Sequence, residues 1–304
     1  MRTLNRSMIV AMAALVSVQS AWADPLSGTL GKIKDSGVIT VAYRDAAIPF
    51  SYLADASGMP VGYSQDIQSV VIDEIKNELH MPELKVQYNL VTSQTRLPLI
   101  QNGTVDLECG STTNNVERQQ QVAFSVGIFE ISTRMLTAAH SGYHEFADLR
   151  GKNVVTTAGT TAEKLLRSMN AEQQMGLNVI SAKDHGESFQ TLESGRAVAF
   201  VQDDALLAGE RAKARNPEKW VITAAPLSNE IYGCMLRKGD PQFKQLVDTA
   251  IKHLFASDRI APLYAKWFEQ PIAPKGLSLN YPMPEVVKSL YAHPTDAPVQ
   301  PLVN

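Results

Sequence analysis

The stretch Glu108-Cys-Gly-Ser-Thr-Thr-Asn-Asn-Val-Glu-Arg118 follows a short strand-like run, Val105-Asp-Leu107. It supplies the hydroxyls of Ser111 and Thr113 and then the guanidinium of Arg118. A guanidinium can donate to both oxygens of a carboxylate, and hydroxyls and backbone N–H groups at a strand-to-helix turn complete an anion site. The stretch therefore predicts a carboxylate-binding loop. The plainer alternative is a polar loop whose arginine caps a helix or pairs with the neighbouring acid.

Strand-like and helix-like segments alternate on both sides of this loop. Val38 to Ala42 reads as a strand, apolar residues recur every four positions from Ile67 to Leu79, and Leu84 to Tyr88 reads as a second strand. After residue 150, helical segments alternate with strands over 153–157, 179–181 and 197–201. This alternation predicts an α/β fold with ligands at the carboxyl ends of strands.

Two segments share one plan, which suggests two similar lobes. Leu99 to Leu107 and Thr191 to Ala199 each read as helix, cap glycine and strand, with polar residues at or beyond the strand's end. Polar groups at equivalent strand ends of two lobes are what a cleft needs. The tail from Pro271 holds seven of the sixteen prolines, so we expect it to be extended and to lie along the first lobe.

The N-terminus reads as a secretory signal. Arg2 and Arg6 are positive, Met8 to Val18 is apolar, and Ala21-Trp-Ala23 is a small-x-small cleavage site. An apolar run of about a dozen residues is too short to span a bilayer, and no cysteine directly follows the site. We therefore expect cleavage after Ala23 and a free periplasmic protein. Cleavage would leave 281 of the 304 residues and shift the formal charge from −3 to −5.

Composition and spacing exclude several classes of function. The mildly acidic balance, without a Lys/Arg cluster, argues against a nucleic-acid partner. No dense metal-ligand spacing and no glycine-rich phosphate loop is present, so neither a metal nor a cofactor is expected. The two cysteines, Cys109 and Cys234, lie in or beside strand-like segments of a chain bound for a compartment that permits disulfides. A bridge between them and two buried free thiols are both open at this point.

The loop at 108–118 resembles the ligand loop of periplasmic amino-acid-binding proteins of ABC importers, the family 3 solute-binding proteins. Further matching segments extend the resemblance over essentially the whole chain after the signal: Gly159-Thr-Thr161, Ser194-Gly-Arg196 with Asp203, and Arg237-Lys-Gly-Asp240. The resemblance implies a two-lobed periplasmic binding protein fold (type II), each lobe a central sheet flanked by helices, with the ligand cleft between the lobes.

The resemblance also implies how the chain divides between the lobes. After a signal peptide at 1–23, lobe 1 is expected over 24–131 and 228–304, and lobe 2 over 132–227. The extended runs at 124–136 and 230–236 then become the crossovers between the lobes.

A free amino acid is a zwitterion, which needs a cation for its α-carboxylate and an acid for its ammonium. In the family, groups spaced like Ser111, Thr113 and Arg118 hold the α-carboxylate, and hydroxyls at a helix N-terminus, Thr160 and Thr161 here, would donate further bonds. Asp203 is expected to hold the ammonium. Its plainer role would be to cap the helix that follows.

Two further arginines indicate an acidic ligand side chain. Arg44 stands just past the first strand, and Arg96 lies near the start of the helix after Ser93. Two such arginines would repel each other unless an anion lay between them. They suit a second carboxylate, with Ser93, Ser111 and His185 as additional donors. The alternatives are a solvated Arg96 and a loop histidine at 185.

The resemblance is most specific to the glutamate/aspartate-binding members of the family, through Arg44-Asp45, Ser93 to Arg96, Glu108 to Asn115 and Ala182 to Gly186. It implies a monomer that is not an enzyme and that delivers glutamate or aspartate to the membrane permease and ATPase subunits of an ABC importer. The alternative is a periplasmic enzyme on a related two-lobed fold, such as a prephenate/arogenate-type dehydratase. Asp203 discriminates between them, because an ammonium needs it and an acid without an amine would be repelled.

Overall fold

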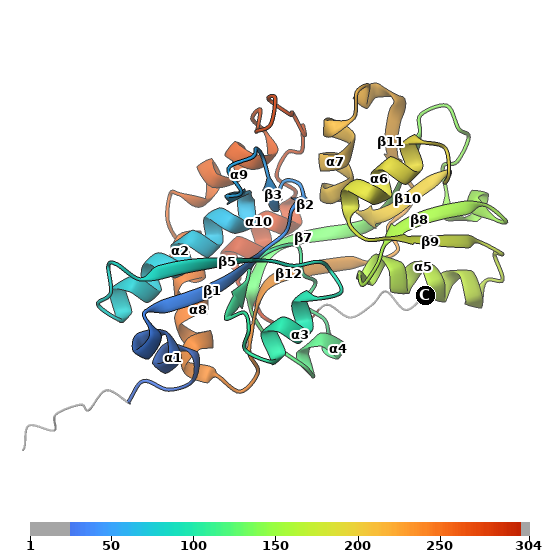
Figure 1. The fold of residues 1–304 in the computed structure, drawn as a ribbon. Helices are drawn as coiled ribbons and strands as arrows, with labels where there is room; N and C mark the ends of the chain where they lie inside the picture. Colours follow the sequence, from blue (N-terminus) through green and yellow to red (C-terminus); the bar gives the residue numbers. More distant parts are fainter. Residues whose placement is uncertain (1–24, 299–304) are drawn as a thin grey trace, which may run out of the picture.

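The computed structural model describes residues 25–298, which form a mixed α/β fold (Figure 1). The predicted signal peptide at 1–23, with its cleavage site after Ala23, lies outside this range. Within the range, no helix has the length and apolar character needed to cross a membrane. The order of the elements in this range confirms the alternation of strands and helices that the sequence predicts.

A nine-stranded sheet runs through both lobes in the order β5-β1-β6-β12-β7-β10-β8-β9, with β11 (Trp220–Thr223) also paired to β7. The strand β7 (Ala123–Ala138) pairs with β12 (Asn229–Leu236) along its first part and with β10 (Ala199–Asp203) along its second. In Figure 1, β7 and β12 lie side by side and run from one lobe toward the other. These two strands are the extended runs that the sequence predicts as crossovers.

Lobe 1 contains the parallel strands β1 (Val38–Tyr43), β5 (Lys85–Leu90) and β6 (Leu107–Glu108). A small separate sheet is formed by β2 (Ala46–Ala47), β3 (Ser51–Leu53) and β4 (Pro60–Val61). The helices of this lobe are α1 (Gly28–Ser36), α2 (Tyr63–Glu78), α3 (Arg96–Gln101), α4 (Val116–Gln119), α8 (Pro241–Phe255), α9 (Ile260–Phe268) and α10 (Glu285–Ala292). Its core is rich in packed aromatic rings, with Phe129 stacked on Phe268 at 4.8 Å between ring centroids.

Lobe 2 contains β8 (Asn153–Thr157), β9 (Asn178–Ala182), β10 and β11. Its helical segments are η1 (Phe146–Leu149), α5 (Thr161–Glu172), α6 (His185–Glu193), α7 (Asp204–Lys213) and η2 (Pro217–Lys219). Successive side chains of a strand point to opposite faces. Along β10, Val201 belongs to one buried apolar cluster and Phe200 to another. Apolar residues at consecutive positions therefore allow helices to cover both faces of this sheet.

The tail after Pro271 corrects one expectation, because it is not extended throughout. Helix α10 forms within it and buries Val287, Leu290 and Tyr291 against lobe 1. The spacing of these three residues places them on one helical face. Pro284 stands at the N-cap, just before the helix begins, where its missing N–H costs nothing. Burial of this short apolar face therefore stabilises a helix within a tail that is otherwise rich in proline.

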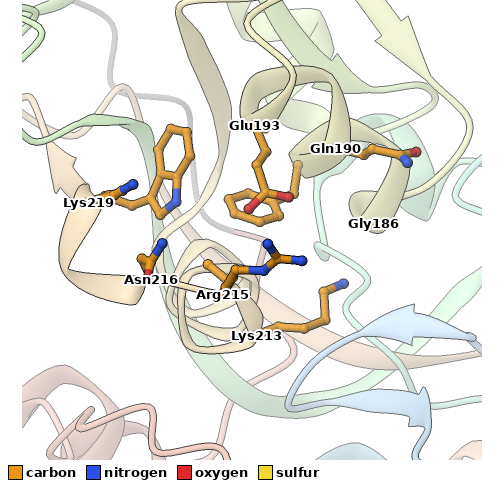
Figure 2. A pocket seen from close by; sticks show the side chains of 10 residues that line it. Gly186, Gln190, Glu193, Lys213, Arg215, Asn216 and Lys219 are labelled. Carbon is orange, nitrogen blue, oxygen red and sulfur yellow. The ribbon is translucent and has the colours of Figure 1, made fainter.

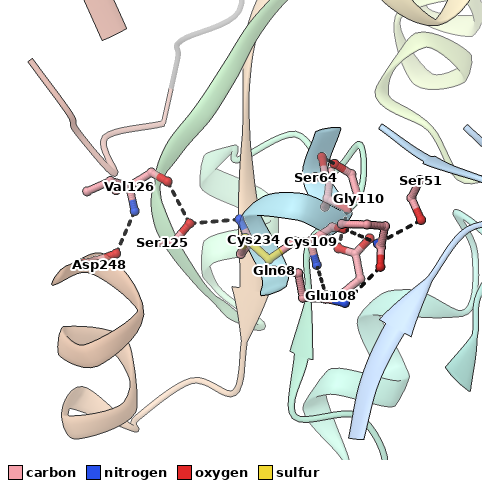
Figure 3. The surroundings of a disulfide bond; sticks show 12 residues. Ser51, Ser64, Gln68, Glu108, Cys109, Gly110, Ser125, Val126, Cys234 and Asp248 are labelled. Atoms are coloured by element: carbon pink, nitrogen blue, oxygen red, sulfur yellow. Dashed lines mark hydrogen bonds between the residues drawn. A yellow bond between two sulfur atoms is a disulfide. The ribbon is translucent and has the colours of Figure 1, made fainter. Parts of the chain in front are cut away.

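A disulfide joins Cys109 to Cys234, with an S–S distance of 2.08 Å (Figure 3). Both cysteines are fully buried. The backbone N–H of Cys109 donates to Gln68 Oε1 at 3.1 Å, and that of Cys234 donates to Ser125 Oγ at 3.0 Å. The bond therefore fixes the start of the 108–118 loop to the crossover strand β12, and the sequence alternative of two free thiols does not hold.

Candidate ligand-binding site

The predicted residues are positioned by strand ends and helix starts on both lobes. In lobe 2, the turn from β8 to α5 carries Thr160 and Thr161, α6 begins at His185, and β10 ends at Asp203. Strands β9 and β10 both run parallel to β8, so these three positions share one edge of the sheet. That edge is where α/β sheets bind ligands.

Arg118 is almost fully buried between the two lobes. Its Nη1 donates to the carbonyl of Thr113 at 2.9 Å, and its Nη2 donates to the carbonyl of Gly159, on lobe 2, at 3.3 Å. Its neighbour Glu117 pairs instead with Lys164 across the lobes. Burial and the charge of Arg96 lower the pKa of Arg118 to about 10. Neither simpler explanation of Arg118 fits, since its side chain donates to the carbonyls of Thr113 and Gly159, which end no helix, and does not pair with Glu117.

Arg44 and Arg96 are the largest fully buried side chains of the described chain, at 1% and 2% exposure. Arg96 Nη1 donates to the carbonyl of Ser111 at 2.9 Å and to Thr112 Oγ1 at 2.5 Å, so it also supports the 108–118 loop. Burial, and next to it the charge of Arg96, lowers the pKa of Arg44 to about 10, and burial lowers the pKa of Arg96. Glu108 is the acid that most offsets both charges, and the buried Asp203 also raises the pKa of Arg96. Arg96 is therefore a buried residue, and the alternative of a solvated helix charge is wrong.

Buried polar atoms without a hydrogen-bond partner are concentrated on residues that the sequence predicts to bind the ligand side chain. Of ten such side-chain atoms within residues 25–298, six belong to five predicted residues: Arg44 (Nε and Nη1), Ser93, Arg96, Ser111 and His185. Buried polar groups in folded proteins are normally paired, because an unpaired one costs about 1–3 kcal/mol. The cluster consists mainly of donors. It therefore suits an acceptor-rich ligand group such as a carboxylate.

His185 is a buried residue at the start of α6, not a loop histidine. Its Nδ1 lies 2.8 Å from Thr157 Oγ1, and its Nε2 is among the unpaired atoms. Burial, together with the charges of Arg44 and Arg96, lowers the pKa of His185 well below its usual value. The imidazole is therefore neutral at pH 7.

Asp203 is buried at the end of β10. Its carboxylate accepts hydrogen bonds from the hydroxyl of Tyr232 and, at 3.4 Å, from Thr133 Oγ1. It makes no side-chain cap to α7, so the simpler capping role does not apply. Burial and the nearby charge of Glu230 raise the pKa of Asp203 to about 8. This is a carboxyl group that a neighbouring cation would readily ionise.

Three predicted threonines are already engaged in hydrogen bonds. Thr160 caps α5: its hydroxyl accepts from the N–H of Glu163 at 3.1 Å and donates to the carbonyl of Thr157 at 2.7 Å. The hydroxyls of Thr113 and Thr161 both donate to the carboxylate of Glu230. Sequence reasoning missed Glu230. The available signal was an acidic residue at the start of a strand whose following residues are all apolar or small.

Candidate catalytic geometry is not formed around the polar residues of the cleft. The hydroxyl of Ser111 has no partner within residues 25–298, while His185 contacts Thr157, and Asp203 contacts Tyr232 and Thr133. A serine nucleophile requires a histidine within hydrogen-bond reach, itself oriented by an acid. Across the described residues, no group of three or more His, Cys, Asp or Glu is arranged to hold a metal ion.

Two hollows help to locate the site. A groove of about 650 Å³ between the lobes is lined in part by Ser93, Arg118, Thr160 and Thr161. A second hollow, of about 820 Å³, lies on lobe 2 between α6 and the segment that follows α7 (Figure 2). Lys213, Arg215 and Glu193 line it, and none of the predicted ligand residues does. The interlobe region, and not this larger hollow, is therefore the candidate site.

Comparison with known proteins gives consistent matches over most of the chain. A family model described as bacterial extracellular solute-binding proteins, family 3, matches residues 39–270. The L-glutamate/L-aspartate-binding protein of Pseudomonas aeruginosa is 62% identical over 285 residues, which cover 94% of each protein. The glutamate/aspartate import solute-binding protein of Escherichia coli is 50% identical and covers 96% of this chain and 98% of its own.

A solved structure shows the same fold with more distant sequence. It is an ancestral amino-acid-binding protein, AncCDT-1, described as a precursor of cyclohexadienyl dehydratase. It is 26% identical, has a TM-score of 0.67, and covers 79% of this chain and 99% of its own. The fold that the sequence predicts, two lobes with a central sheet and flanking helices, is therefore confirmed.

Proposed function

The chain belongs to the bacterial extracellular solute-binding proteins of family 3, and we propose that it captures L-glutamate and L-aspartate for an ABC importer. The observation that carries this proposal is the cluster of unpaired donors on Arg44, Arg96, Ser93, Ser111 and His185. Two buried guanidiniums with free N–H groups match a second carboxylate. A neutral ligand side chain would leave the two positive charges offset mainly by Glu108.

The α-carboxylate is assigned to Arg118 and to the N-terminus of α5. The Thr160 hydroxyl is used in capping, so the backbone N–H groups of the first turn supply the donors on that side. Asp203 receives the ammonium. Its ionisation, which burial opposes, is favoured by a bound cation.

We also propose how the chain is organised around the site. Lobe 1 comprises 24–131 and 228–304, and lobe 2 comprises 132–227, with the ligand touching both. The protein is exported to the periplasm, is cleaved after Ala23 and acts as a monomer. Its closed, ligand-bound form docks on the permease, which works with the ATPase subunits.

The runner-up function is a periplasmic dehydratase acting on a prephenate-like acid. This alternative is supported by the structural similarity to a protein described as a precursor of cyclohexadienyl dehydratase. The relatives at 62% and 50% identity are named as binding proteins, and the buried carboxylate of Asp203 favours an amine-bearing ligand over a plain diacid. We therefore assign no enzymatic activity to the chain.

Isothermal titration of the purified protein with L-glutamate, L-aspartate, L-glutamine and prephenate tests the proposal. We expect the two acidic amino acids to bind more tightly than glutamine, and prephenate to remain intact after incubation. Preferred binding of glutamine, or conversion of prephenate, would overturn the assignment.

A further inference from the structure

Glu230 lies on the crossover strand β12 and contacts both lobes at once. Its Oε2 accepts hydrogen bonds from Thr113 Oγ1 of lobe 1 at 2.5 Å and from Thr161 Oγ1 of lobe 2 at 2.7 Å. Its Oε1 accepts from Ser228 Oγ at 2.9 Å. The side chain is buried, at 6% exposure. One carboxylate therefore orients a hydroxyl on each wall of the cleft.

The direction of these hydrogen bonds restricts what the two threonines can do for a ligand. A threonine hydroxyl has one proton and two acceptor lone pairs, and a carboxylate only accepts. Thr113 and Thr161 therefore each give their single proton to Glu230. Toward any other group, both hydroxyls can act only as acceptors. A ligand carboxylate, which also only accepts, is a poor partner for them, whereas an ammonium is a good one.

The surrounding charges favour a cation at the same place. The guanidinium of Arg118, whose pKa the charge of Glu230 raises, donates to two backbone carbonyls and not to Glu230. Asp203 stands close enough for the charge of Glu230 to raise the pKa of Asp203. The two acids are also linked by contacts, since Ser228 Oγ lies 2.9 Å from both Glu230 Oε1 and Thr133 Oγ1, and Thr133 Oγ1 lies 3.4 Å from Asp203.

We propose that Glu230 is a specificity-determining residue: by holding the protons of Thr113 and Thr161, it makes both hydroxyls acceptors for an amino acid's ammonium. The inference rests on the proposed function and refines it. Sequence reasoning assigned both threonines to the α-carboxylate. On this view they face the ammonium, and the α-carboxylate is left to Arg118 and the backbone of α5.

The test compares L-glutamate with glutarate, the same diacid without the amine, by isothermal titration. Glu230→Gln removes the negative charge. It also places an amide NH2 group, which donates, opposite one of the two threonine hydroxyls. We expect the affinity for L-glutamate to fall by about tenfold or more, because a charged hydrogen-bonding group is lost. The affinity for glutarate, measured by competition where direct heat is small, should fall by less than about threefold or rise, since no ammonium is present to need the acceptors.

Glu130→Gln is the matched control. Glu130 lies on β7 opposite Ile231, next to Glu230 in the ladder, and is only partly buried. The Glu130→Gln variant loses the same charge from the same pair of strands. Its ratio of glutamate to glutarate affinity should equal that of the wild type. Circular dichroism melting of each variant checks that it folds.

Thr113→Val and Thr161→Val extend the test in case Glu230→Gln does not fold. Each removes one acceptor at nearly constant volume, so each should weaken L-glutamate binding selectively. Equal losses for glutamate and glutarate in these variants, or an unchanged ratio in Glu230→Gln, would overturn the specificity role alone. A wild-type protein that binds no acidic amino acid would overturn the proposed function, and the role of Glu230 with it.

Discussion

Gly209 on helix α7 lies so close to Ile48 that a Cβ atom added at Gly209 would stand 2.3 Å from the Ile48 carbonyl oxygen. A second glycine, Gly159, is also constrained, since its φ is +78° and its added Cβ would lie 2.9 Å from the backbone nitrogen of Gln94. Both contacts join lobe 2 to lobe 1. The lobes therefore meet backbone against backbone at two points that tolerate no side chain.

Replacing Gly209 by alanine should hinder closure without damaging lobe 2. In a helix interior, alanine is more favourable than glycine by about 1 kcal/mol, so the substitution should not weaken α7 itself. A ligand shifts the equilibrium only by its differential affinity for the closed state. We expect the affinity for L-glutamate to fall by about tenfold or more. Small-angle scattering should show less ligand-induced compaction than in the wild type.

Gly186→Ala is the control for Gly209→Ala. An added Cβ at Gly186 meets the side chain of Ala46 at 3.8 Å, an ordinary contact between the lobes. This variant should bind and compact like the wild type. Normal compaction of Gly209→Ala would show that closure does not require the contact with Ile48.

Arg44→Met should remove selectivity for an acidic side chain. Methionine retains apolar bulk, but it leaves a ligand carboxylate short of a cation, and breaking such a buried pair costs about 3–5 kcal/mol. Glutamate affinity should fall by at least about a hundredfold, and glutamine affinity by much less. Titration with both ligands measures this, with the exposed Arg259→Met as control. Equal losses for the two ligands would refute the assignment of Arg44 to the distal carboxylate.

The stability of the ligand-free protein should depend on pH through Asp203. Burial raises the pKa of Asp203 in the folded protein to about 8. Between the unfolded and folded pKa values the folded state therefore binds more protons, and its stability falls as pH rises. The slope contributed by this group is at most about 1.4 kcal/mol per pH unit.

Urea unfolding of ligand-free wild type and Asp203→Asn, from pH 5 to pH 8, measures this contribution. Asparagine cannot titrate, so the free energy of unfolding of the variant should decline less steeply with pH. Parallel curves for the two proteins would mean that Asp203 is already ionised in the folded state. Adding L-glutamate should stabilise the wild type more at pH 8 than at pH 6, because the ammonium favours the ionised carboxylate.

Loss of the disulfide should weaken the protein without changing its ligand preference. The bond closes a loop between residues 125 positions apart, and removing a native disulfide typically costs about 2–5 kcal/mol. The double variant Cys109→Ala/Cys234→Ala should unfold at lower urea but keep the wild-type ratio of glutamate to glutamine affinity. The unreduced wild type, denatured, should show no reactive thiol. Two thiols per chain would contradict the bond.

Residues whose role follows from local chemistry could be predicted from the sequence. Arg44, Arg96 and Arg118 stand directly after strands or at helix starts, where the α/β plan brings side chains together, and the structure buries all three. The roles of the predicted residues toward a ligand remain predictions. The strand at 153–157 could be predicted because Val154 to Thr157 are all β-branched.

Features that depend on contacts between distant segments could not be predicted. Glu230 acquires its role only because Thr113 and Thr161, far away in the sequence, both reach its carboxylate. Gly209 reads as a weak point in a helix until Ile48 is placed against it. The sequence signal for helix α10 is only the spacing of three apolar residues, and it lies within a proline-rich tail whose composition predicts an extended chain.

The position of β12 in the sheet, between β6 and β7, has a consequence for the order in which the chain can acquire its structure. A chain that emerges N-terminus first can complete the strands and helices of lobe 2 while lobe 1 still lacks a central strand. Until residues 229–236 arrive, β6 and β7 have no common neighbour, and Cys109 has no partner for oxidation. The sheet of lobe 1 and the disulfide can therefore be completed only after residues 229–236 are available.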